Sequence, residues 1–433
     1  MIVDGGARGH ALAEAYLRSL EVDEVLVAPG NRGMICPDIR IRSDTSLKDS
    51  QSFLSVAQEY QPDLIDVAQD DALAAGTVDL LVENDFRTFG PTQAAARIES
   101  DKVWARMFMN RHDISQPTHK AFFREDWKAE DFAYKLLDES EIIFIKAAGL
   151  YAGKGVISAS NKEEVVLTLE QMKSMGPAAE KILIDKGEIG EEFSYKAMVG
   201  GEHYLCFRSA QDNKRVWNQD KGPMTGGMGC NSPALVTKGL EDTIEEKIIG
   251  RAVAGLYAEG IPFTGILYLG GMLCEDGSVK VIEFNARWGD PECTVILPGI
   301  QNDYFQLVNA AIDGKLDRVQ LEQDDLTRVC VVGASAGYPR DYEKGKRLWI
   351  DESGFPADTH YLSAGIDVRD GQMYTADGRV FDIVATDTNV IGARRKALQA
   401  MACCDIEDNG LYYRTDTAWR DTMKHRDNMV VKR

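Results

Sequence analysis

The sequence KAAGLYAGKGV, residues 146–156, places three glycines directly after the apolar run IIFI. A phosphate-binding loop of the Walker type requires G-x-x-x-x-G-K-[ST] and leads from a strand into a helix. Here only three residues separate Gly149 from Gly153, Lys154 is followed by Gly155, and the next run, VISAS, is typical of a strand. The stretch is therefore a glycine-rich connection between two strands and not a P-loop.

Two interpretations of this connection remain open. A glycine-rich hairpin can lie over phosphate groups, with its backbone N–H groups closing on the anion and Lys154 adding positive charge. The simpler interpretation is a mobile surface hairpin, which glycines alone favour. Only the motifs elsewhere in the chain can decide between them.

Length and charge restrict the classes of protein to consider. The chain has 433 residues, too many for one compact core, and we expect two to four structural units. Its net charge is -20 with the acidic residues spread along the chain, and no Lys/Arg-rich stripe stands out. This pattern disfavours a nucleic-acid partner but is compatible with a small anionic ligand held by a few local cations.

Cysteine usage and apolar runs indicate the compartment. The 8 cysteines form neither a C-x-x-C pair nor a zinc-binding spacing with histidine, so free thiols are expected. The first residues, MIVDGGARGH, lack the pattern of a secretory signal. No uncharged apolar run approaches the roughly 20 residues that a membrane helix needs. We therefore expect a soluble, cytoplasmic protein.

The apolar pattern predicts a multidomain α/β and α+β chain. Short strand-like and helix-like runs alternate over the first 100 residues, which favours a parallel sheet. Residues 91–112 predict one long helix with Thr92 as its cap. Residues 141–160 and 265–287 each predict a pair of strands, and the chain beyond about residue 325 predicts a separate β-rich unit. Considered alone, Lys102 within the predicted helix is interpreted as an ordinary surface lysine.

The run VKVIEFNARWGDPE indicates a metal site. Side chains alternate along a strand, so Glu283, Asn285 and Arg287 share one face. A carboxylate and an amide oxygen two residues apart suit Mg²⁺, which takes waters and phosphate oxygens as further ligands. Arg287 could hold an anionic substrate or a phosphoryl group in transfer. A solvated strand face with a surface charge pair explains the same pattern.

A long polar segment, residues 209–233, is the third candidate. Asp212, Lys214 and Arg215 precede the run TGGMG, in which glycines permit tight turns and close approach of the backbone to a ligand. Ordering such a segment costs conformational entropy, which favours a functional role. An ordinary long loop fits the composition equally well.

Taken in order, these motifs resemble one family. The runs FGPTQAAARIESDK, IFIKAAGLYAGKGV, AQDNKRVWNQDKGPMTGGMG and KVIEFNARWGDPE are similar to those of the phosphoribosylamine–glycine ligases, ATP-grasp enzymes of purine biosynthesis. GGARGHALAEAY, VAPGNRG, VCVVGASAGYPRDYEKG and GLYYRTD extend the resemblance from about residue 4 to about residue 415. It implies a parallel α/β domain over 1–100, an ATP-grasp domain over 101–325 with a mobile lid at about 117–188, and a β-rich domain over 326–433.

The resemblance implies ligation of glycine to 5-phosphoribosylamine through an acyl phosphate, with ATP and Mg²⁺ as cofactors and Mn²⁺ as an alternative. Its expected partners are small molecules, with no nucleic acid or membrane, and the chain is expected to be a monomer or weak homodimer. Residues expected to contact ATP are Lys102, Lys146, Gly149, Gly153, Lys154, Gly155, Ile184, Asp185, Lys186 and Glu192. Residues expected to contact the substrates are Gly6, Arg8, Asn31, Gly33, Lys214, Arg215, Asp290, Pro291 and Glu292. Glu283 and Asn285 are expected to hold the metal ion, and Arg287, Lys146 and Asp212 to act in catalysis.

The chain departs from the family pattern at four places. Gly9 stands where a glutamate is usual, Ala148 where an aspartate is usual, AQDDAL (68–73) replaces a GPE-x-PL segment, and DKG (185–187) replaces the EEF hinge. Two alternatives therefore stay open beside the glycine ligase. One is a related ATP-grasp ligase that joins a different amine or acid, and the other is a nucleotide-binding relative without catalysis. Retention of Lys102, Lys146 and Glu283 argues against the last.

Overall fold

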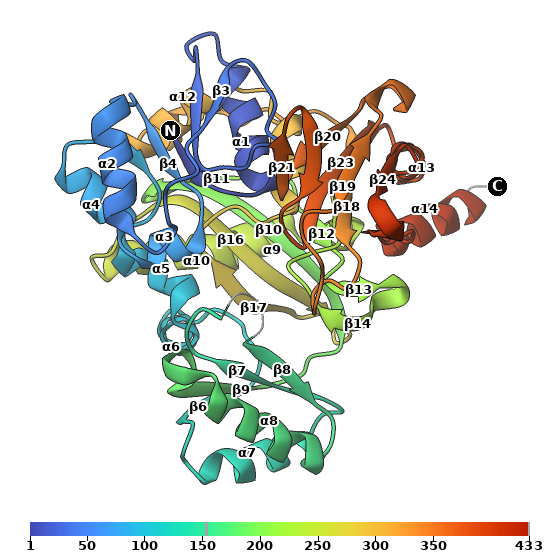
Figure 1. Ribbon diagram of the computed structural model, residues 1–433. Helices are drawn as coiled ribbons and strands as arrows, with labels where there is room; N and C mark the ends of the chain where they lie inside the picture. Colours follow the sequence, from blue (N-terminus) through green and yellow to red (C-terminus); the bar gives the residue numbers. More distant parts are fainter. Residues whose placement is uncertain (152–154, 432–433) are drawn as a thin grey trace.

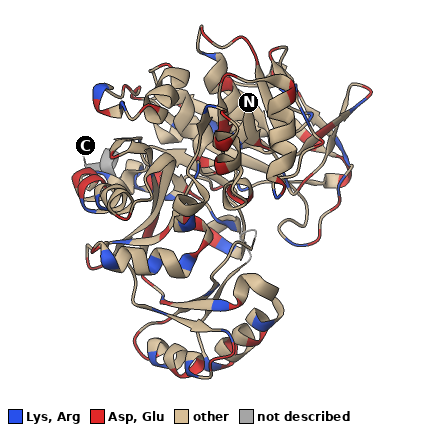
Figure 2. Cartoon of the chain, turned by 90° about the vertical axis from the view of Figure 1, so that its left-hand side faces the viewer, with Lys and Arg blue, Asp and Glu red and all other residues tan. Residues whose placement is uncertain are grey.

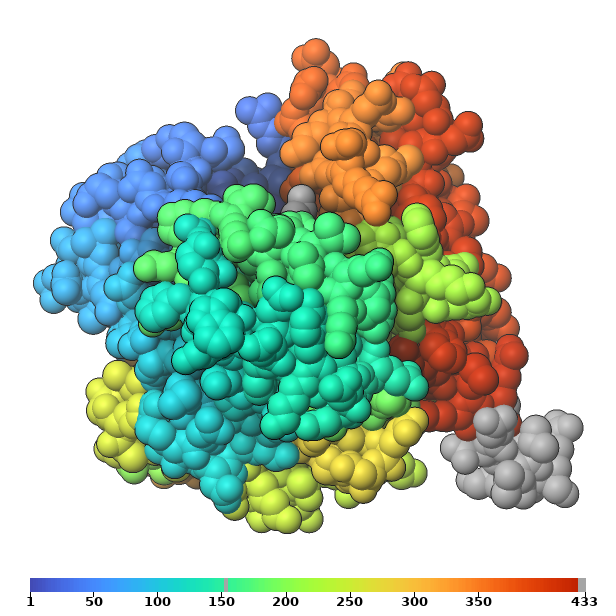
Figure 3. Space-filling view, turned by 90° about the horizontal axis from the view of Figure 1, so that it is seen from below, coloured from blue at the N-terminus to red at the C-terminus, as the bar shows by residue number. Residues whose placement is uncertain are grey.

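The computed structural model describes residues 1–151 and 155–431, the side chains of 427–431 excepted. An N-terminal domain and a C-terminal domain lie beside each other on a central sheet, and a small subdomain projects from the opposite side (Figure 1). Seen from below, this small subdomain lies in front of the rest of the molecule, with the N-terminal domain on one side and the C-terminal domain on the other (Figure 3).

The N-terminal domain is built on a five-stranded sheet in which every adjacent pair is parallel, as the alternating pattern predicts. Its strand order is β3-β2-β1-β4-β5. The strands are β1 (Ile2–Asp4), β2 (Val25–Pro29), β3 (Ile39–Ile41), β4 (Ile65–Val67) and β5 (Thr88–Phe89). The helices are α1 (Ala7–Leu17), α2 (Ser50–Tyr60), α3 (Asp70–Ala74) and α4 (Thr77–Glu83). The carboxyl ends of parallel strands meet at one edge, so the segments after β1, β2 and β4 come together there.

The single helix expected over residues 91–112 is wrong. The chain forms α5 (Gln93–Ser100) and α6 (Lys102–Arg111), with Asp101 in an extended conformation between them. Thr92 caps α5 as predicted, since its side chain accepts from Ala95 N. Asp101 Oδ1 accepts from Trp104 N at 2.9 Å and so caps α6. This break makes Lys102 the first residue of a helix.

The small subdomain is an antiparallel sheet of order β6-β9-β7-β8 covered by α7 and α8. Its elements are β6 (His119–Phe123), α7 (Lys128–Leu137), β7 (Ile143–Ala147), β8 (Val156–Ala159), α8 (Lys162–Ser174) and β9 (Lys181–Lys186). The strands β7 and β8 pair antiparallel across the glycine-rich connection, which confirms the predicted pair of strands. Apolar residues of this subdomain form a core of their own.

The central sheet is antiparallel, in the order β11-β10-β16-β17. Its strands are β10 (Gly190–Gly201), β11 (His203–Cys206), β16 (Phe263–Cys274) and β17 (Val279–Asn285), of which the last two confirm the hairpin predicted over 265–287. The helices between and after them are α9 (Glu241–Ile244), α10 (Arg251–Ala258), α11 (Glu292–Ile296) and α12 (Tyr304–Ile312). One core joins this sheet to the N-terminal domain, so the two are held rigidly together.

The C-terminal domain is β-rich, as predicted. Its larger sheet runs β12-β15-β18-β23-β20, with β25 also paired to β18, and its smaller sheet runs β21-β22-β19-β24. Strands of the larger sheet are β12 (Gln211–Asp212), β15 (Gly229–Ser232), β18 (Thr327–Ser335), β20 (Thr359–Ser363), β23 (Arg379–Asp387) and β25 (Leu411–Tyr412). Those of the smaller sheet are β19 (Arg347–Ile350), β21 (Ile366–Arg369), β22 (Gln372–Thr375) and β24 (Cys404–Ile406). The helices are α13 (Val390–Met401) and α14 (Trp419–Val431).

The polar segment 209–233 is not a plain loop. Its two ends form β12 and β15, which extend the larger sheet of the C-terminal domain, and its middle forms the hairpin β13 (Arg215–Trp217) and β14 (Lys221–Met224). Asp212 and Lys214 therefore lie where the C-terminal domain meets the central sheet.

Charge is distributed over the whole molecule. Lysine and arginine are interspersed with aspartate and glutamate on every part of the chain (Figure 2). Within the described ranges, no helix has both the length and the apolar character needed to cross a bilayer.

Candidate active site

Four cations lie close enough to the carboxylate of Glu283, near the end of β17, to act on its charge. Burial raises the pKa of Glu283, but Lys214, Lys102, Lys146 and Arg287 together outweigh it and bring the pKa below its usual value. They come from four segments: the loop after β12, the start of α6, strand β7 and the turn after β17. The sequence motifs that seemed separate thus meet at one carboxylate. This convergence defines the candidate site.

Lys146 is buried, with a relative exposure of 6%, and does not stand alone. Its Nζ lies 2.8 Å from Asp185 Oδ2 on the adjacent strand β9, and Arg106 of α6 bonds the same oxygen. Burial raises the pKa of Asp185, but Lys146 and Arg106 together bring it below its usual value. The side chain of Asp185 is therefore engaged with two cations. Arg106 carries no motif in the sequence, and its role was not predicted.

The glycine-rich connection contacts the start of α6. Lys102 N donates to Ala148 O at 2.9 Å, and Gly149 N donates to Ala178 O at 2.9 Å. Ala147 N donates to Gly155 O at 2.8 Å, which closes the base of the hairpin. The predicted ATP contacts Gly153 and Lys154 lie outside the described residues. Lys102 and Lys146 are thus held by the same small region of backbone.

Glu283 and Asn285 fit a hard divalent cation. Glu283 is ionised at neutral pH, since its pKa is lowered, and Asn285 adds a neutral oxygen from a site only 9% exposed. Within the described part of the chain, neither side chain enters a hydrogen bond or an ion pair. Among those residues no group of three His, Cys, Asp or Glu side chains forms a metal site either. A metal held here would need further oxygen ligands from a phosphate or from water.

Arg287 is held by the carboxylate of Glu99, which lies within the run FGPTQAAARIESDK but was not predicted to have a role. Its Nη2 lies 2.8 Å from Glu99 Oε1 of α5, and its Nη1 donates to Trp288 O at 3.1 Å. Glu99 is 7% exposed, and its other oxygen accepts from Ala286 N at 2.7 Å. Glu99 therefore clamps both the backbone and the guanidinium of the turn after β17. This leaves Arg287 beside Glu283 in a set orientation.

Lys196, Glu292 and Asp212 form a second cluster of charged side chains next to this site. Lys196 of β10 is fully buried, and its Nζ lies 3.4 Å from Glu292 Oε1. Burial raises the pKa of Glu292, but Lys196 and the backbone N–H of Glu292 outweigh it and lower the pKa to about 2. Burial and Glu292 raise the pKa of Asp212 well above its usual value. Asp212 Oδ1 has no hydrogen-bond partner among the described residues and is shielded from solvent.

The charge of Lys214 interacts with both clusters, with Glu283 of the first and with Asp212 and Glu292 of the second. It lies 3.4 Å from Glu192 Oε2 on β10, and this carboxylate raises the pKa of Lys214. Lys196 was missed in the sequence because a lysine within a strand pattern carries no signal of burial. Arg215, which was predicted to contact a substrate, donates from Nη1 to Gly222 O at 2.8 Å within its own hairpin.

Two of the predicted substrate residues of the N-terminal domain, Asn31 and Gly33, lie at the junction with the C-terminal domain. Asn31 donates to Gly5 O at 3.1 Å and to Ser363 O at 3.2 Å. A Cβ on Gly33 would meet the side chains of Ser363 and Ile366, so Gly33 allows this contact between domains.

Asp290, in the turn after β17, reaches the same junction. Its Oδ1 lies 3.3 Å from Arg379 Nη1 of the C-terminal domain, and its Oδ2 lies 3.2 Å from where a Cβ on Gly6 would be. Pro291 packs against Gly227, at which a Cβ would be 2.5 Å from Pro291 Cδ. The turn after β17 therefore contacts all the large domains.

The remaining predicted ATP contacts lie at the root of the small subdomain. Ile184 is fully buried in the core of this subdomain, whereas Lys186, the last residue of β9, is half-buried. Lys186 N donates to Thr118 O at 2.8 Å. β9 thus leads directly from the partner of Lys146 into β10, which carries Glu192 and Lys196.

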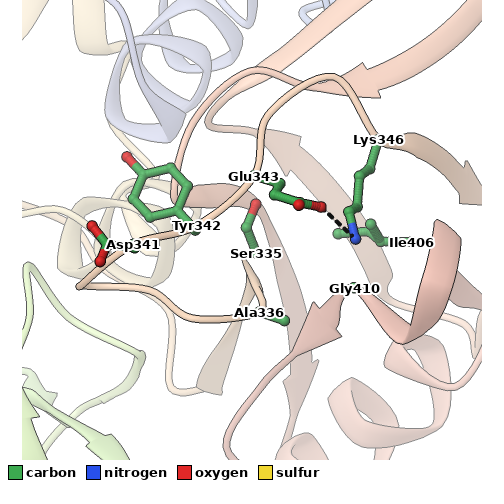
Figure 4. Close-up of a pocket in the computed structure, with 8 residues that line it drawn as sticks. All are labelled: Ser335, Ala336, Asp341, Tyr342, Glu343, Lys346, Ile406 and Gly410. Carbon is green, nitrogen blue, oxygen red and sulfur yellow. Dashed lines mark ion pairs between the residues drawn. The ribbon is translucent and has the colours of Figure 1, made fainter.

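A separate hollow of about 340 Å³ lies in the C-terminal domain (Figure 4). Lys346 pairs there with Glu343 at 2.9 Å, while Tyr342 and Asp341 lie on the other side of Ser335. None of the residues predicted to bind ATP, substrate or metal lines this hollow. The charge cluster at Glu283 combines five charged groups, of which Lys146 is buried and the other four are half-buried, and it is the stronger candidate for a reaction site.

Comparison with known protein families gives three matches along the chain. The N domain of phosphoribosylglycinamide synthetase matches residues 1–99, its ATP-grasp (A) domain matches 100–293, and its C domain matches 328–420.

The curated relatives carry related names. The phosphoribosylamine–glycine ligase of Ralstonia nicotianae is 37% identical over 427 residues, which cover 97% of this chain and 98% of the relative. That of Salmonella typhimurium is 38% identical over 429 residues, with the same coverage. The trifunctional purine biosynthetic protein adenosine-3 of Bos taurus is also 38% identical over 429 residues. This chain spans 42% of the length of that trifunctional protein.

Solved structures agree with this grouping. The phosphoribosylamine–glycine ligase of Thermotoga maritima superposes with a TM-score of 0.79 at 29% identity, covering 96% of this chain and 99% of that one. The biotin carboxylase domain of Hydrogenobacter thermophilus 2-oxoglutarate carboxylase, in complex with MgADP, has a TM-score of 0.72 at 13% identity and covers 95% and 91%. The predicted ATP-grasp fold, with its parallel N-terminal sheet and β-rich C-terminal domain, is confirmed.

Proposed function

The chain belongs to the phosphoribosylglycinamide synthetase family, and on that basis we propose that it ligates glycine to 5-phosphoribosylamine at the expense of ATP. The products are glycinamide ribonucleotide, ADP and phosphate. The observation that carries this proposal is the convergence of Lys102, Lys146, Lys214 and Arg287 on Glu283. Such a set of cations around one carboxylate suits a bound nucleoside triphosphate with a divalent metal ion.

The reaction needs an activated acid, because a carboxylate is a poor electrophile at neutral pH. An oxygen of the glycine carboxylate attacks the γ-phosphorus, and the bond from that phosphorus to the ADP oxygen breaks. The amine nitrogen of phosphoribosylamine then attacks the acyl carbon, and phosphate leaves. Phosphoryl transfer of this kind depends on positioning and on positive charge around the group in transfer.

The chain's own residues supply both requirements. We assign Lys102 and Lys146 to the phosphates of ATP and Arg287 to the phosphoryl group in transfer. Glu283 and Asn285 would hold the metal ion, which would supply positive charge to offset that of the phosphates. Their hard oxygen donors favour Mg²⁺, with Mn²⁺ as an alternative of similar preference.

The proposed acceptor of the proton released in the second step is Asp212. Its Oδ1 is shielded from solvent and has no hydrogen-bond partner among the described residues, and burial and Glu292 raise the pKa of the carboxyl group well above the usual value, which makes the carboxylate a stronger base than usual. Attack of an amine on an acyl phosphate releases one proton from nitrogen. We assign Asp212 to accept it, with Lys196 holding the charge of Glu292 in place.

One omission experiment tests the proposed function. ADP release is measured with ATP, Mg²⁺, glycine and freshly generated phosphoribosylamine, and then with either co-substrate left out. Release that requires both supports the proposal. Release that requires some other amine or acid would replace it with a related ligase, the alternative that Gly9 and Ala148 favour. No release with any pair of substrates would leave a nucleotide-binding protein.

A further inference from the structure

One buried carboxylate of the N-terminal domain has no part in the motifs above. Asp4 ends β1 and is 1% exposed. Its Oδ1 accepts hydrogen bonds from Gly6 N at 2.7 Å and from Gly9 N at 3.1 Å. Its Oδ2 accepts from Arg8 Nε at 2.6 Å. Both oxygens of Asp4 are therefore committed to the first turn of α1.

These bonds replace the usual cap of a helix. Gly6 is the N-cap of α1 and offers no side chain to cap it. In a capping box, the N-cap side chain bonds the N–H of the third helical residue, and a carboxylate on that third residue reaches back to the N–H of the N-cap. Here Gly9 is the third helical residue and has no side chain, and Asp4 Oδ1 makes both of these bonds.

The absence of a side chain at Gly9 is required by Asp4. A Cβ on Gly9 would lie 2.9 Å from Asp4 Cβ and 3.0 Å from Asp4 Oδ1, closer than such contacts normally come. A side chain at position 9 and the carboxylate of Asp4 therefore compete for the same volume. A carboxylate at position 4 therefore excludes a side chain at position 9, and a side chain at position 9 excludes the carboxylate at position 4.

Asp4 fixes a guanidinium that joins three segments. Besides its bond to Asp4, Arg8 donates from Nη1 to Trp288 O at 3.0 Å and from Nη2 to the side-chain oxygen of Gln69. Trp288 follows Arg287 in the turn after β17, and Gln69 follows β4. Bonds to the described residues thus use three of the five N–H groups of Arg8 and leave two for a ligand.

We propose that Asp4 is the positioning residue for Arg8, supplying from β1 the carboxylate that a glutamate at position 9 would otherwise supply. The identity of the ligand of Arg8, phosphoribosylamine, rests on the proposed function. The pairing of Asp4 with Gly9 does not, because it follows from the contacts alone.

Three variants test this pairing: Asp4→Gly, Gly9→Glu and the double variant. Asp4→Gly is expected to raise the KM for phosphoribosylamine by about tenfold or more, which is the loss expected for one charge-assisted hydrogen bond. The KM for ATP is expected to stay within about twofold of the wild-type value. Gly9→Glu places a second carboxylate in the volume that the Asp4 side chain occupies. It is expected to lower the midpoint of thermal unfolding below that of Asp4→Gly. The double variant is expected to regain most of both losses. Asp23→Gly, at an exposed position of the same domain, is the matched control.

Two results would overturn the proposal. One is an Asp4→Gly protein that loses thermal stability but keeps the wild-type KM for phosphoribosylamine, since Asp4 would then be only a helix cap. The other is a double variant whose losses are the sum of those of the single variants. If the wild-type protein makes no product from glycine and phosphoribosylamine, the proposed function fails. The unfolding midpoints of the four proteins would still decide whether positions 4 and 9 exchange one carboxylate.

Discussion

At the scale of single residues, the alternation of side chains along a strand was the most useful basis for prediction. It predicted that Glu283, Asn285 and Arg287 share one face of a strand, but only the first two lie on β17, and Arg287 lies in the turn after it. The cations of the site act on Glu283. The residues that hold this group could not be predicted in the same way. Glu99 and Lys196 come from distant elements, and their function depends on burial, which a single charged letter in the sequence does not reveal. Asp4 was missed for the same reason.

Glu283→Gln should lower kcat by about a hundredfold or more, because it removes a charged metal ligand while keeping the shape of the side chain. The Mg²⁺ concentration needed for half-maximal rate should rise. Steady-state rates over a Mg²⁺ titration measure both effects. Glu275→Gln, at the exposed turn between β16 and β17, is the control and should behave as the wild type. A near-normal rate for Glu283→Gln would exclude it as a metal ligand.

Asp185→Asn should lower the free energy of unfolding by about 3–5 kcal/mol, because it leaves Lys146 and Arg106 buried without their shared counter-charge. The folded-state pKa of Asp185 lies below its usual value, so this carboxylate stabilises the fold above about pH 4 and loses that effect as the pH falls through the folded-state pKa.

The dependence of the free energy of unfolding on acid pH tests this role of Asp185. Urea unfolding at pH 7 and at several values below pH 4 should show that the variant loses less stability on acidification than the wild type does. Equal acid dependence in the two proteins would mean that the ion pair with Lys146 contributes little in solution.

At the scale of elements, strands and their pairing were predicted better than helix ends. The β7–β8 and β16–β17 pairs follow from apolar runs around glycine turns, which are local signals. The break between α5 and α6 was missed because Asp101 interrupts an otherwise continuous helical pattern. The ends of segment 209–233 join a sheet whose other strands come more than 90 residues later, and no local pattern carries that pairing.

Asp101→Ala should lower the free energy of unfolding by about 1 kcal/mol through loss of the α6 cap. It should also raise the KM for ATP, since α6 begins with Lys102. Asp101→Ser keeps an acceptor at the cap and is expected to recover most of both losses. Chemical denaturation and ATP titration of the two variants provide the measurement. Equal behaviour of the alanine and serine variants would show that the cap does not position Lys102.

At the scale of the whole molecule, the small subdomain stands apart. Its core contains residues from its own sheet and helices alone, whereas the N-terminal domain and central sheet share a core. Two of the cations at Glu283, Lys146 and Lys214, come from opposite sides of the junction between this subdomain and the body. We therefore expect nucleotide binding to draw the subdomain towards the central sheet.

Hydrogen exchange measures this closure directly. Adding Mg²⁺ and ATP should slow amide exchange in peptides that cover β7 and β9 more than in peptides from the smaller sheet of the C-terminal domain, which serve as the internal control. The effect should disappear in the Lys146→Met variant. Protection spread evenly over all domains, or none, would contradict a subdomain that closes on the nucleotide.

Isotope transfer tests whether this chain activates the carboxylate of glycine as an acyl phosphate. Glycine labelled with ¹⁸O in both carboxylate oxygens is incubated with ATP, Mg²⁺, phosphoribosylamine and the enzyme. One ¹⁸O should appear in inorganic phosphate for each amide formed, because phosphate leaves with an oxygen of the acid. Phosphate free of label, formed together with the amide, would contradict it.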